Sequence, residues 1–341
     1  MSHKLFSFST IPLFFIFCLP PLVSSFPSGG GRFGFGTYDF YARSCPYLPM
    51  IVTNDVQTAI RNDNRMAASL LRLHFHDCFV NVIVAGCDAS ILLDDTDELE
   101  GEKNALPNRN SVRGYEVIDS IKADVEKACP STVSCVDILA LAAREAVVQS
   151  GGPFWPVQLG RRDGLTANKA AANSELPSPI EPLKNITAKF IAKGLDIKDV
   201  AVLSGAHTVG FAQCFTFKHR LFNYKGTGRP DPALDSSALP NLQSICPNQD
   251  SSNTNLSPLD TASVYRFDNG YYTNLVQSTG LLESDQALMG DSTTAALVRA
   301  YSMNPYLFSS DFAVSMAKMG NIGVLTGQDG EIRKVCRSVN N

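Results

Sequence analysis

The stretch Arg72-Leu73-His74-Phe75-His76-Asp77-Cys78-Phe79 places an arginine, two histidines and two phenylalanines in one short segment. It follows the apolar, alanine-rich run 66–71, and the combined pattern predicts a helix over 66–79. Arg72 and His76 are four residues apart, so on a helix they lie on one face. A guanidinium that keeps its charge, beside an imidazole that can exchange a proton, is suited to splitting a polar bond.

Two other interpretations of the same residues stay open at this point. A histidine on an apolar helix is often an ordinary core residue, and the spacing His74-x-His76-x-Cys78 is similar to that of zinc ligands. Ligands two residues apart share one face of a strand, however, and the surrounding pattern is helical. A zinc-dependent secreted hydrolase built on His74 and His76 is the rival from another enzyme class. The catalytic interpretation needs a partner elsewhere in the chain.

That partner is Leu203-Ser204-Gly205-Ala206-His207-Thr208-Val209-Gly210. With the first stretch, it resembles the secretory plant peroxidases of class III, and the resemblance continues in family order from about Tyr38 to the C-terminus. It implies a mostly α, two-lobed helical fold with very little β structure, in which a haem lies between a distal and a proximal half. The catalytic domain is then expected at 38–341, as a monomer.

On the proximal side, the resemblance implies one haem b whose iron is bound by His207. Asp285 matches the family's proximal aspartate, which accepts the other N–H of the ligating histidine and strengthens its electron donation. Phe75 and Ser69 are expected to line the haem from the distal helix. Pro177 matches the family's substrate-contacting proline, and the implied electron donors are small phenolic compounds.

On the distal side, the resemblance implies that His76 takes a proton from hydrogen peroxide and returns it to the departing oxygen. Arg72 stabilises the bound hydroperoxide and then the leaving oxygen. His76 has to be neutral at rest, so its second ring nitrogen needs an acceptor. The loop 101–108 resembles the family's supporting loop, with Asn108 accepting from His76 and Glu102 holding Asn108.

Oxygen-bearing residues beside both histidines match the two calcium sites of the family. Calcium prefers about six to eight oxygen ligands from carboxylates, hydroxyls and carbonyls. The implied distal ligands are Asp77, the carbonyls of Val80 and Gly86, Asp88 and Ser90. The implied proximal ligands are Thr208, Asp260, Ser263, the carbonyl of Arg266 and Asp268. Because each set adjoins one haem-side histidine, loss of calcium is expected to loosen the surroundings of the iron.

The first residues of the chain predict export. The segment 1–25 has a basic start, an apolar centre and a small-residue end, a pattern typical of a secretory signal peptide. The segment 26–37 is glycine-rich and is expected to be flexible. Loss of Cys18 with the signal leaves eight cysteines for an oxidising compartment, the extracellular space or cell wall. The resemblance pairs them as Cys45–Cys129, Cys78–Cys87, Cys135–Cys336 and Cys214–Cys246.

Composition argues against several other classes of protein. A net charge of −4 argues against an electrostatic nucleic-acid binder. After the signal, the sequence has no apolar run long enough for a membrane-spanning helix. Charged residues make up 18% and hydrophobic residues 44% of the chain, as in ordinary soluble domains. Asn185 and Asn255 begin glycan-acceptor motifs, which is consistent with export.

One segment departs from the family pattern. Val82-Ile83-Val84-Ala85 lies between Asn81 and Gly86, where the family runs directly from asparagine to glycine. These residues enlarge the loop between Cys78 and Cys87 and separate two implied calcium ligands. They put the distal calcium site and this disulfide in doubt. A haem-binding but weakly active wall protein is therefore the alternative function.

Helical periodicity dominates the rest of the sequence. Helices are predicted over 50–61, 66–79, 115–128, 133–149, 186–193, 198–204, 265–278, 293–302 and 309–319. Strand patterns are few and short, and joints rich in proline and glycine fall at 151–153, 176–182 and 226–232. The pattern therefore predicts a mostly α fold class.

Overall fold

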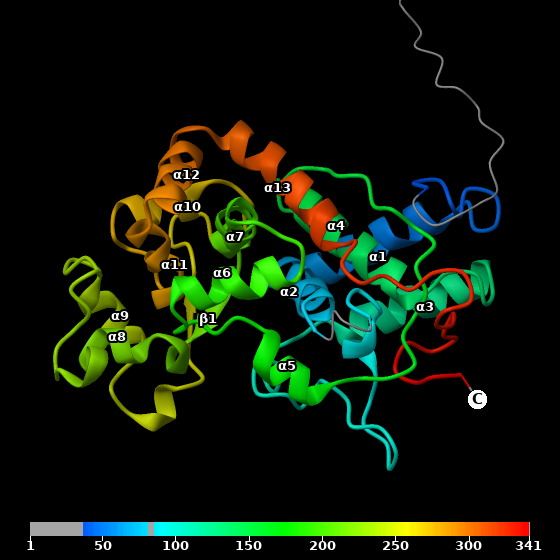
Figure 1. Cartoon of the computed structure of the whole chain (residues 1–341), viewed down its shortest axis with the longest axis horizontal. Helices are drawn as coiled ribbons and strands as arrows, with labels where there is room; N and C mark the ends of the chain where they lie inside the picture. The colour runs from blue at the N-terminus through cyan, green and yellow to red at the C-terminus, as the bar shows by residue number, and fades with distance from the viewer. Residues whose placement is uncertain (1–36, 81–84, 341) are drawn as a thin grey trace, which may run out of the picture. The chain divides into compact units, whose positions relative to one another are not determined.

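Helices dominate the residues that the computed structural model describes, 37–80 and 85–340 (Figure 1). In chain order they are α1 (Leu48–Asn62), α2 (Met66–Cys78), α3 (Tyr115–Ala128), α4 (Cys135–Gln149), α5 (Lys169–Glu175), α6 (Leu183–Ala192), α7 (Ile197–Ser204), α8 (Lys218–Phe222), α9 (Leu239–Ile245), α10 (Gly270–Val276), α11 (Glu283–Gln286), α12 (Ser292–Met303) and α13 (Pro305–Met319). One antiparallel sheet joins β1 (Phe211–Gln213) to β2 (Leu256–Pro258), with Ala212 opposite Ser257. The predicted mostly α fold class is confirmed.

Most predicted helices are confirmed to within a few residues, and the larger differences have local causes. α13 begins at Pro305 rather than at residue 309 because the Asn304 side chain accepts the Leu307 N–H and proline suits the first turn. α10 begins at Gly270 rather than at residue 265 because the Asp268 carboxylate accepts the Gly270 N–H. The sequence pattern does not predict α5, α8, α9 or α11, since each has seven residues or fewer and shows too little of a helical period.

Some predictions fall on residues that the structure does not describe. The signal peptide at 1–25, nearly all of the segment 26–37, and residues 82–84 of the insertion lie outside the described residues. None of the described helices has both the length and the apolar character needed to cross a bilayer.

Beyond the insertion, Gly86 and Cys87 donate their N–H groups to the carbonyls of Gly323 and Ile322. The main chain that follows the insertion is therefore anchored to the segment after α13.

α2 runs through the hydrophobic core and carries Arg72 and His76. Leu70 and Leu73 on this helix are fully buried, and the helix packs against α4, whose repeated alanines allow a close approach. α1 and α3 pack against α4 as well. Because α2 is packed along its length, the core rather than a surface loop sets the positions of Arg72 and His76.

The segment that presents His207 depends on two glycines. Gly205 opens the short 3-10 helix Gly205–Thr208, and a Cβ at Gly205 would lie 2.3 Å from the Tyr272 hydroxyl. Gly210 has φ +106°, and a Cβ there would lie 2.9 Å from the Cβ of Ala68 on α2. Only glycine satisfies both the backbone angle and the close approach at Gly210. The proximal segment therefore touches the distal helix directly.

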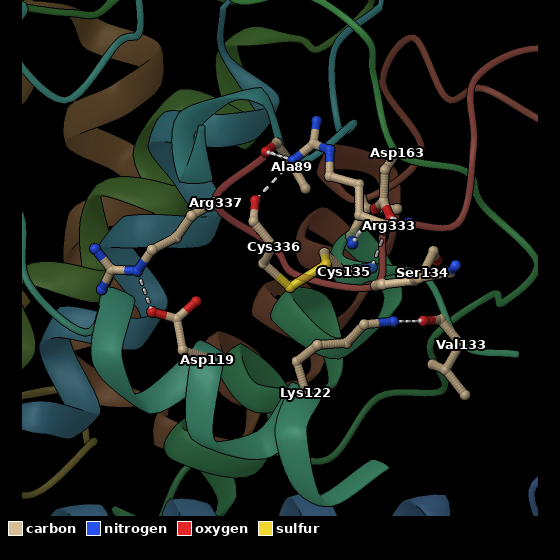
Figure 2. The surroundings of a disulfide bond; sticks show 12 residues. Ala89, Asp119, Lys122, Val133, Ser134, Cys135, Asp163, Arg333, Cys336 and Arg337 are labelled. Atoms are coloured by element: carbon tan, nitrogen blue, oxygen red, sulfur yellow. Dashed lines mark hydrogen bonds and ion pairs between the residues drawn. A yellow bond between two sulfur atoms is a disulfide. The ribbon is translucent and has the colours of Figure 1, made fainter. Parts of the chain in front are cut away.

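The four disulfides have the pairings that the resemblance implies. Figure 2 shows Cys135–Cys336, which fastens the C-terminal segment to the first residue of α4. Beside it, the buried Arg333 donates to the carbonyls of Ala89 and Gly164, and the Asp163 carboxylate accepts the Arg333 N–H. The C-terminal segment thereby supports the loop that follows the insertion.

Candidate functional site

The distal group of side chains is centred on Arg72 and His76 of α2. Their expected shared face is confirmed, since Arg72 Nε donates to His76 Nε2 over 3.1 Å. Arg72 Nη2 also donates to the Pro107 carbonyl at 2.9 Å and to the Ser111 hydroxyl at 3.1 Å. Phe75 packs edge-on against the His76 ring, with 5.7 Å between the ring centroids. α2 and the loop before α3 together fix the direction of the guanidinium.

The two ring nitrogens of His76 have different partners. Nδ1 lies 2.6 Å from Asn108 Oδ1, and Asn108 Nδ2 donates to the main-chain carbonyl of Glu102 at 2.9 Å. The amide oxygen therefore faces the imidazole, so Nδ1 carries the proton and Nε2 keeps its lone pair. Burial lowers the pKa of His76 well below its ordinary value, and the charge of Arg72 lowers it further. His76 is consequently neutral at rest.

Glu102 supports the distal loop through two separate groups. Its main-chain carbonyl holds Asn108, whereas its carboxylate Oε1 accepts the Asn168 N–H at 3.0 Å. Burial raises the pKa of the Glu102 carboxyl to about 7. The expected support of Asn108 by Glu102 thus comes from the main chain, a distinction that a sequence motif does not make.

The proximal group is centred on His207. Its Nδ1 lies 2.9 Å from Asp285 Oδ1, and the Tyr271 hydroxyl donates to the same oxygen at 3.0 Å. Because a carboxylate only accepts, Nδ1 of His207 carries the proton and Nε2 is free to bind a metal. Burial by itself would lower the pKa of His207, but the charge and hydrogen bond of Asp285 raise it above its ordinary value. Sequence reasoning missed Tyr271, which lies in no motif near Asp285.

Arg72 and His207 both keep part of their side chains accessible to solvent. The His207 side chain keeps 40% of its surface accessible, and Arg72 is exposed as well. Yet the surrounding protein desolvates both groups, and burial lowers the pKa of Arg72 to about 10. The charge of Arg72 opposes the rise in the pKa of His207.

The side chains of the two histidine groups fit a haem. Among the described residues, no hydrogen bond engages Nε2 of His207, whereas both nitrogens of His76 have partners, so His207 is the histidine that could bind iron. Ser69 lies one turn before Arg72 on α2, is partly buried and donates its hydroxyl to the Arg65 carbonyl at 3.0 Å. Ser69, Arg72 and Phe75 therefore follow one another at intervals of three residues along α2.

Asp77 and Asp88 place two buried carboxylates next to the distal group. Asp77 Oδ1 has no hydrogen-bond partner within 37–80 and 85–340. Burial and the charge of Asp88 raise the pKa of Asp77 well above its ordinary value, and burial raises that of Asp88 to about 6. A Cβ at Gly164 would lie 2.1 Å from Asp88 Oδ2, so glycine leaves room for this pair, and Ser90 is buried beside it. Calcium would relieve the mutual repulsion, so these residues fit the expected distal site.

The expected proximal calcium ligands also converge. Thr208 Oγ1 donates to Asp268 Oδ1 at 3.2 Å, and Ser263 Oγ donates to Asp260 Oδ2 at 3.3 Å. A Cβ at Gly270 would lie 2.2 Å from Asp260 Oδ2 and 3.0 Å from Asp268 Oδ1. Two carboxylates and two hydroxyls therefore meet around one glycine, a set of oxygens that fits calcium.

Three further residues are expected to bind calcium through their carbonyls. Val80 is buried at the end of α2, Gly86 is anchored to Gly323, and the Arg266 N–H donates to the Ser263 carbonyl at 3.0 Å. Within the described ranges, no three side chains of histidine, cysteine, aspartate or glutamate gather as a metal site. Both expected calcium sets include hydroxyl and carbonyl oxygens as well as carboxylates.

The zinc interpretation of the distal helix is not supported. Cys78 is bonded to Cys87, and His74 Nδ1 lies 3.7 Å from the Cys78 sulfur. Burial and the charge of Arg161 lower the pKa of His74 to about 3. His76 uses both ring nitrogens for other partners. These residues therefore do not form a shared metal site.

Comparison with known proteins points to one family. A family model described as peroxidase matches residues 52–304. The chain is 66% identical over 301 residues to Peroxidase 10 of Arabidopsis thaliana, which covers 88% of this chain and 85% of that protein. It is 52% identical over 342 residues to Peroxidase 54 of the same plant, covering 98% and 92% respectively. It is 54% identical over 306 residues to Peroxidase N of Armoracia rusticana, covering 89% and 90%.

Proposed function

Because the chain belongs to the peroxidase family, we propose that its two histidine groups are the two faces of one haem site. The chain is a peroxidase, an oxidoreductase that reduces hydrogen peroxide with electrons from a reducing substrate. The observation that carries the proposal is the difference between the imidazoles: His207 keeps Nε2 free, whereas His76 has both nitrogens engaged. One imidazole is suited to bind iron, and the other is suited to exchange protons.

On the distal face, His76 is the acid–base group of the proposal. Its Nε2 takes a proton from hydrogen peroxide and returns it to the oxygen that leaves as water. Arg72 lies 3.1 Å from that nitrogen and donates to the oxygen on which negative charge develops. The hydrogen bond to Asn108 keeps the proton on Nδ1, so Nε2 remains the basic atom. The lowered pKa of His76 keeps it neutral before peroxide enters.

On the proximal face, His207 binds the haem through Nε2. When bound, the haem supplies the redox-active iron at which the O–O bond is broken. Asp285 holds the Nδ1 proton of His207, which strengthens electron donation from the imidazole. Tyr271 donates to the same carboxylate oxygen and so fixes the orientation of the ring. This arrangement favours reduction of peroxide over reversible binding of oxygen.

Small phenolic compounds are the proposed electron donors, and each gives up one electron. Pro177, partly buried just after α5, is the proposed donor-contact residue. The signal pattern at 1–25 and the four disulfides support secretion to the extracellular space or cell wall. Two calcium ions, one beside each histidine group, complete the proposed enzyme. The alternative of a weakly active wall protein is not favoured, since similarity to peroxidases covers most of the chain.

The test is the absorption spectrum of the purified protein before and after one equivalent of hydrogen peroxide, and then after a simple phenol. We expect a haem Soret band that shifts with peroxide and returns when the phenol is added. A Soret band that does not respond to peroxide would support the weakly active alternative. A folded protein that takes up no haem would contradict the proposal.

A further inference from the structure

Three side chains outside the two histidine groups meet where residues of α8 and of the turn after it reach α11. The Tyr224 hydroxyl, in that turn, donates to Glu283 Oε1 at 3.0 Å. His219 Nε2, on α8, lies 2.9 Å from Glu283 Oε2. The rings of His219 and Tyr224 stack, with 6.4 Å between their centroids. The phenol is therefore held by a carboxylate at its oxygen and by an imidazole at its ring.

Buried contacts hold this tyrosine in place. Arg220 on α8 is fully buried and donates to the carbonyls of Gly280 and Leu281, just before α11, at 2.6 Å and 2.7 Å. The Tyr224 N–H donates to the Arg229 carbonyl at 2.9 Å, which closes the turn after α8. Because the core joins α8 to the start of α11, the contact between the phenol and Glu283 is fixed by the fold.

Tyr224 combines partial exposure with a proton acceptor. The residue is partly exposed, and Lys225 lies over its ring with Nζ 4.8 Å from the centroid. Burial raises the pKa of Tyr224, Lys225 opposes that rise, and the hydrogen bond to Glu283 adds to it. The phenol is therefore protonated at neutral pH and has to release its proton when it loses an electron. Glu283 is positioned to take that proton.

The same short helix connects the tyrosine to the proximal group. Glu283 and Asp285 are two residues apart on α11, and Asp285 Oδ1 lies 2.9 Å from Nδ1 of His207. One carboxylate of this helix thus binds the phenol, and the other binds the histidine proposed to hold the iron. A path of two hydrogen bonds and one stretch of main chain leads from the partly exposed Tyr224 to His207.

We propose that Tyr224 is a second oxidation site, which takes electrons from phenolic groups on polymers too large to reach the haem. The inference rests on the proposed haem function, because that function supplies the oxidant, the site oxidised by hydrogen peroxide. Tyr224 gives one electron to that site and its hydroxyl proton to Glu283, which leaves a neutral tyrosyl radical. A polymer-bound phenol then gives Tyr224 one electron and releases its own proton to water, while Glu283 returns the first proton. Tyrosine is restored, and a phenoxyl radical remains on the polymer.

The first experiment locates the radical without any phenolic donor. Haem-loaded wild type receives one equivalent of hydrogen peroxide in the presence of a nitroso spin trap, and peptide mass spectrometry identifies the trapped residue. We expect an adduct on Tyr224 in wild type and its loss in Tyr224→Phe. Glu283→Gln keeps the phenol but removes the proton acceptor, so the yield of the Tyr224 adduct should fall in this variant as well.

The second experiment compares free tyramine with tyramine coupled to dextran, which presents the same phenol on a polymer. Tyr224→Phe should lose most of the wild-type oxidation rate with coupled tyramine. It should keep the wild-type rates with free tyramine and with hydrogen peroxide, because neither needs Tyr224. Tyr306→Phe is the matched control, since it removes the phenol of a tyrosine on α13 that is 86% exposed. This control should oxidise both forms of tyramine as wild type does.

Two results would overturn the inference and leave the proposed function intact. One is a wild-type protein that reacts with peroxide but forms no adduct on Tyr224. The other is a Tyr224→Phe variant that oxidises coupled tyramine at the wild-type rate. A wild-type protein that reacts with neither hydrogen peroxide nor free tyramine would instead defeat the proposed function.

Discussion

The distal and proximal groups use the same side chain in opposite ways. His76 and His207 each have Nδ1 within hydrogen-bonding distance of a side-chain oxygen, at 2.6 Å and 2.9 Å. The acceptor is a neutral amide for His76 and a carboxylate for His207. Burial and Arg72 drive the pKa of His76 down, whereas Asp285 outweighs burial and raises the pKa of His207. In the proposed function, the charge of the hydrogen-bond partner separates the proton acceptor from the metal ligand.

The largest effect is expected from removing the distal base. In His76→Ala, the rate constant for reaction with hydrogen peroxide should fall by about 10²–10⁴-fold, because no group remains to take the proton. Stopped-flow absorption at the Soret band measures this rate. His219→Gln, a histidine paired with Glu283 outside both groups, is the control and should react at the wild-type rate. A His76→Ala variant as fast as wild type would contradict the distal assignment.

Replacing the proximal carboxylate by an amide makes the proximal side resemble the distal side. Asp285→Asn should slow the peroxide reaction by about 10–100-fold, because His207 loses the charge that strengthens its donation to iron. Tyr271→Phe removes only one hydrogen bond to the same carboxylate and should have a much smaller effect. The two variants are compared by stopped-flow under the same conditions. Equal effects would show that the charge of Asp285 is not the decisive feature.

The reverse substitution, Asn108→Asp, makes the distal side resemble the proximal side. Its effect is expected in the pH dependence of the peroxide reaction rate. Neutral His76 is the reactive form and its pKa is lowered, so the wild-type peroxide rate should stay level through neutral pH. The rate should fall only when the pH drops through that lowered pKa. In Asn108→Asp, a carboxylate would stabilise the imidazolium and move the acid limb to higher pH. An acid limb at the wild-type position in this variant would argue against Asn108 as the partner that matters.

The smallest effect on activity is expected at the distal calcium site. In Gly164→Ala, the new Cβ would displace the Asp88 carboxylate, since it would lie 2.1 Å from Oδ2. We expect calcium affinity to fall about ten-fold and unfolding free energy to drop by about 1–3 kcal/mol. Calcium titration and thermal unfolding measure the two quantities. Gly290→Ala is the control, because a Cβ at Gly290 meets no described atom within 4 Å. Identical calcium affinity in the two variants would refute the placement of the ion beside Asp88.

Local patterns predicted the helices that carry the distal group. The helix predicted over 66–79 matches α2, and the spacing of Arg72 and His76 predicts their observed contact. α13 begins before residue 309, where apolar periodicity predicts its start, because the Asn304 cap and Pro305 set its first turn. The disulfide pairing came from the family resemblance, since eight cysteines allow about 105 pairings.

Other parts of the site are not encoded in any short motif. Ser111 lies 39 residues from Arg72, and Tyr271 lies 14 residues from Asp285. Contacts of this kind exist only after the chain has folded, so periodicity and spacing carry no sign of them.

The most direct measurement is the resonance Raman spectrum of the ferrous haem protein, which detects the iron–imidazole stretch. The account predicts this band in wild type and in His76→Ala, and its loss in His207→Gln. A band that survives in His207→Gln, or that disappears in His76→Ala, would show that the ligand and the proton acceptor have been assigned to the wrong histidines.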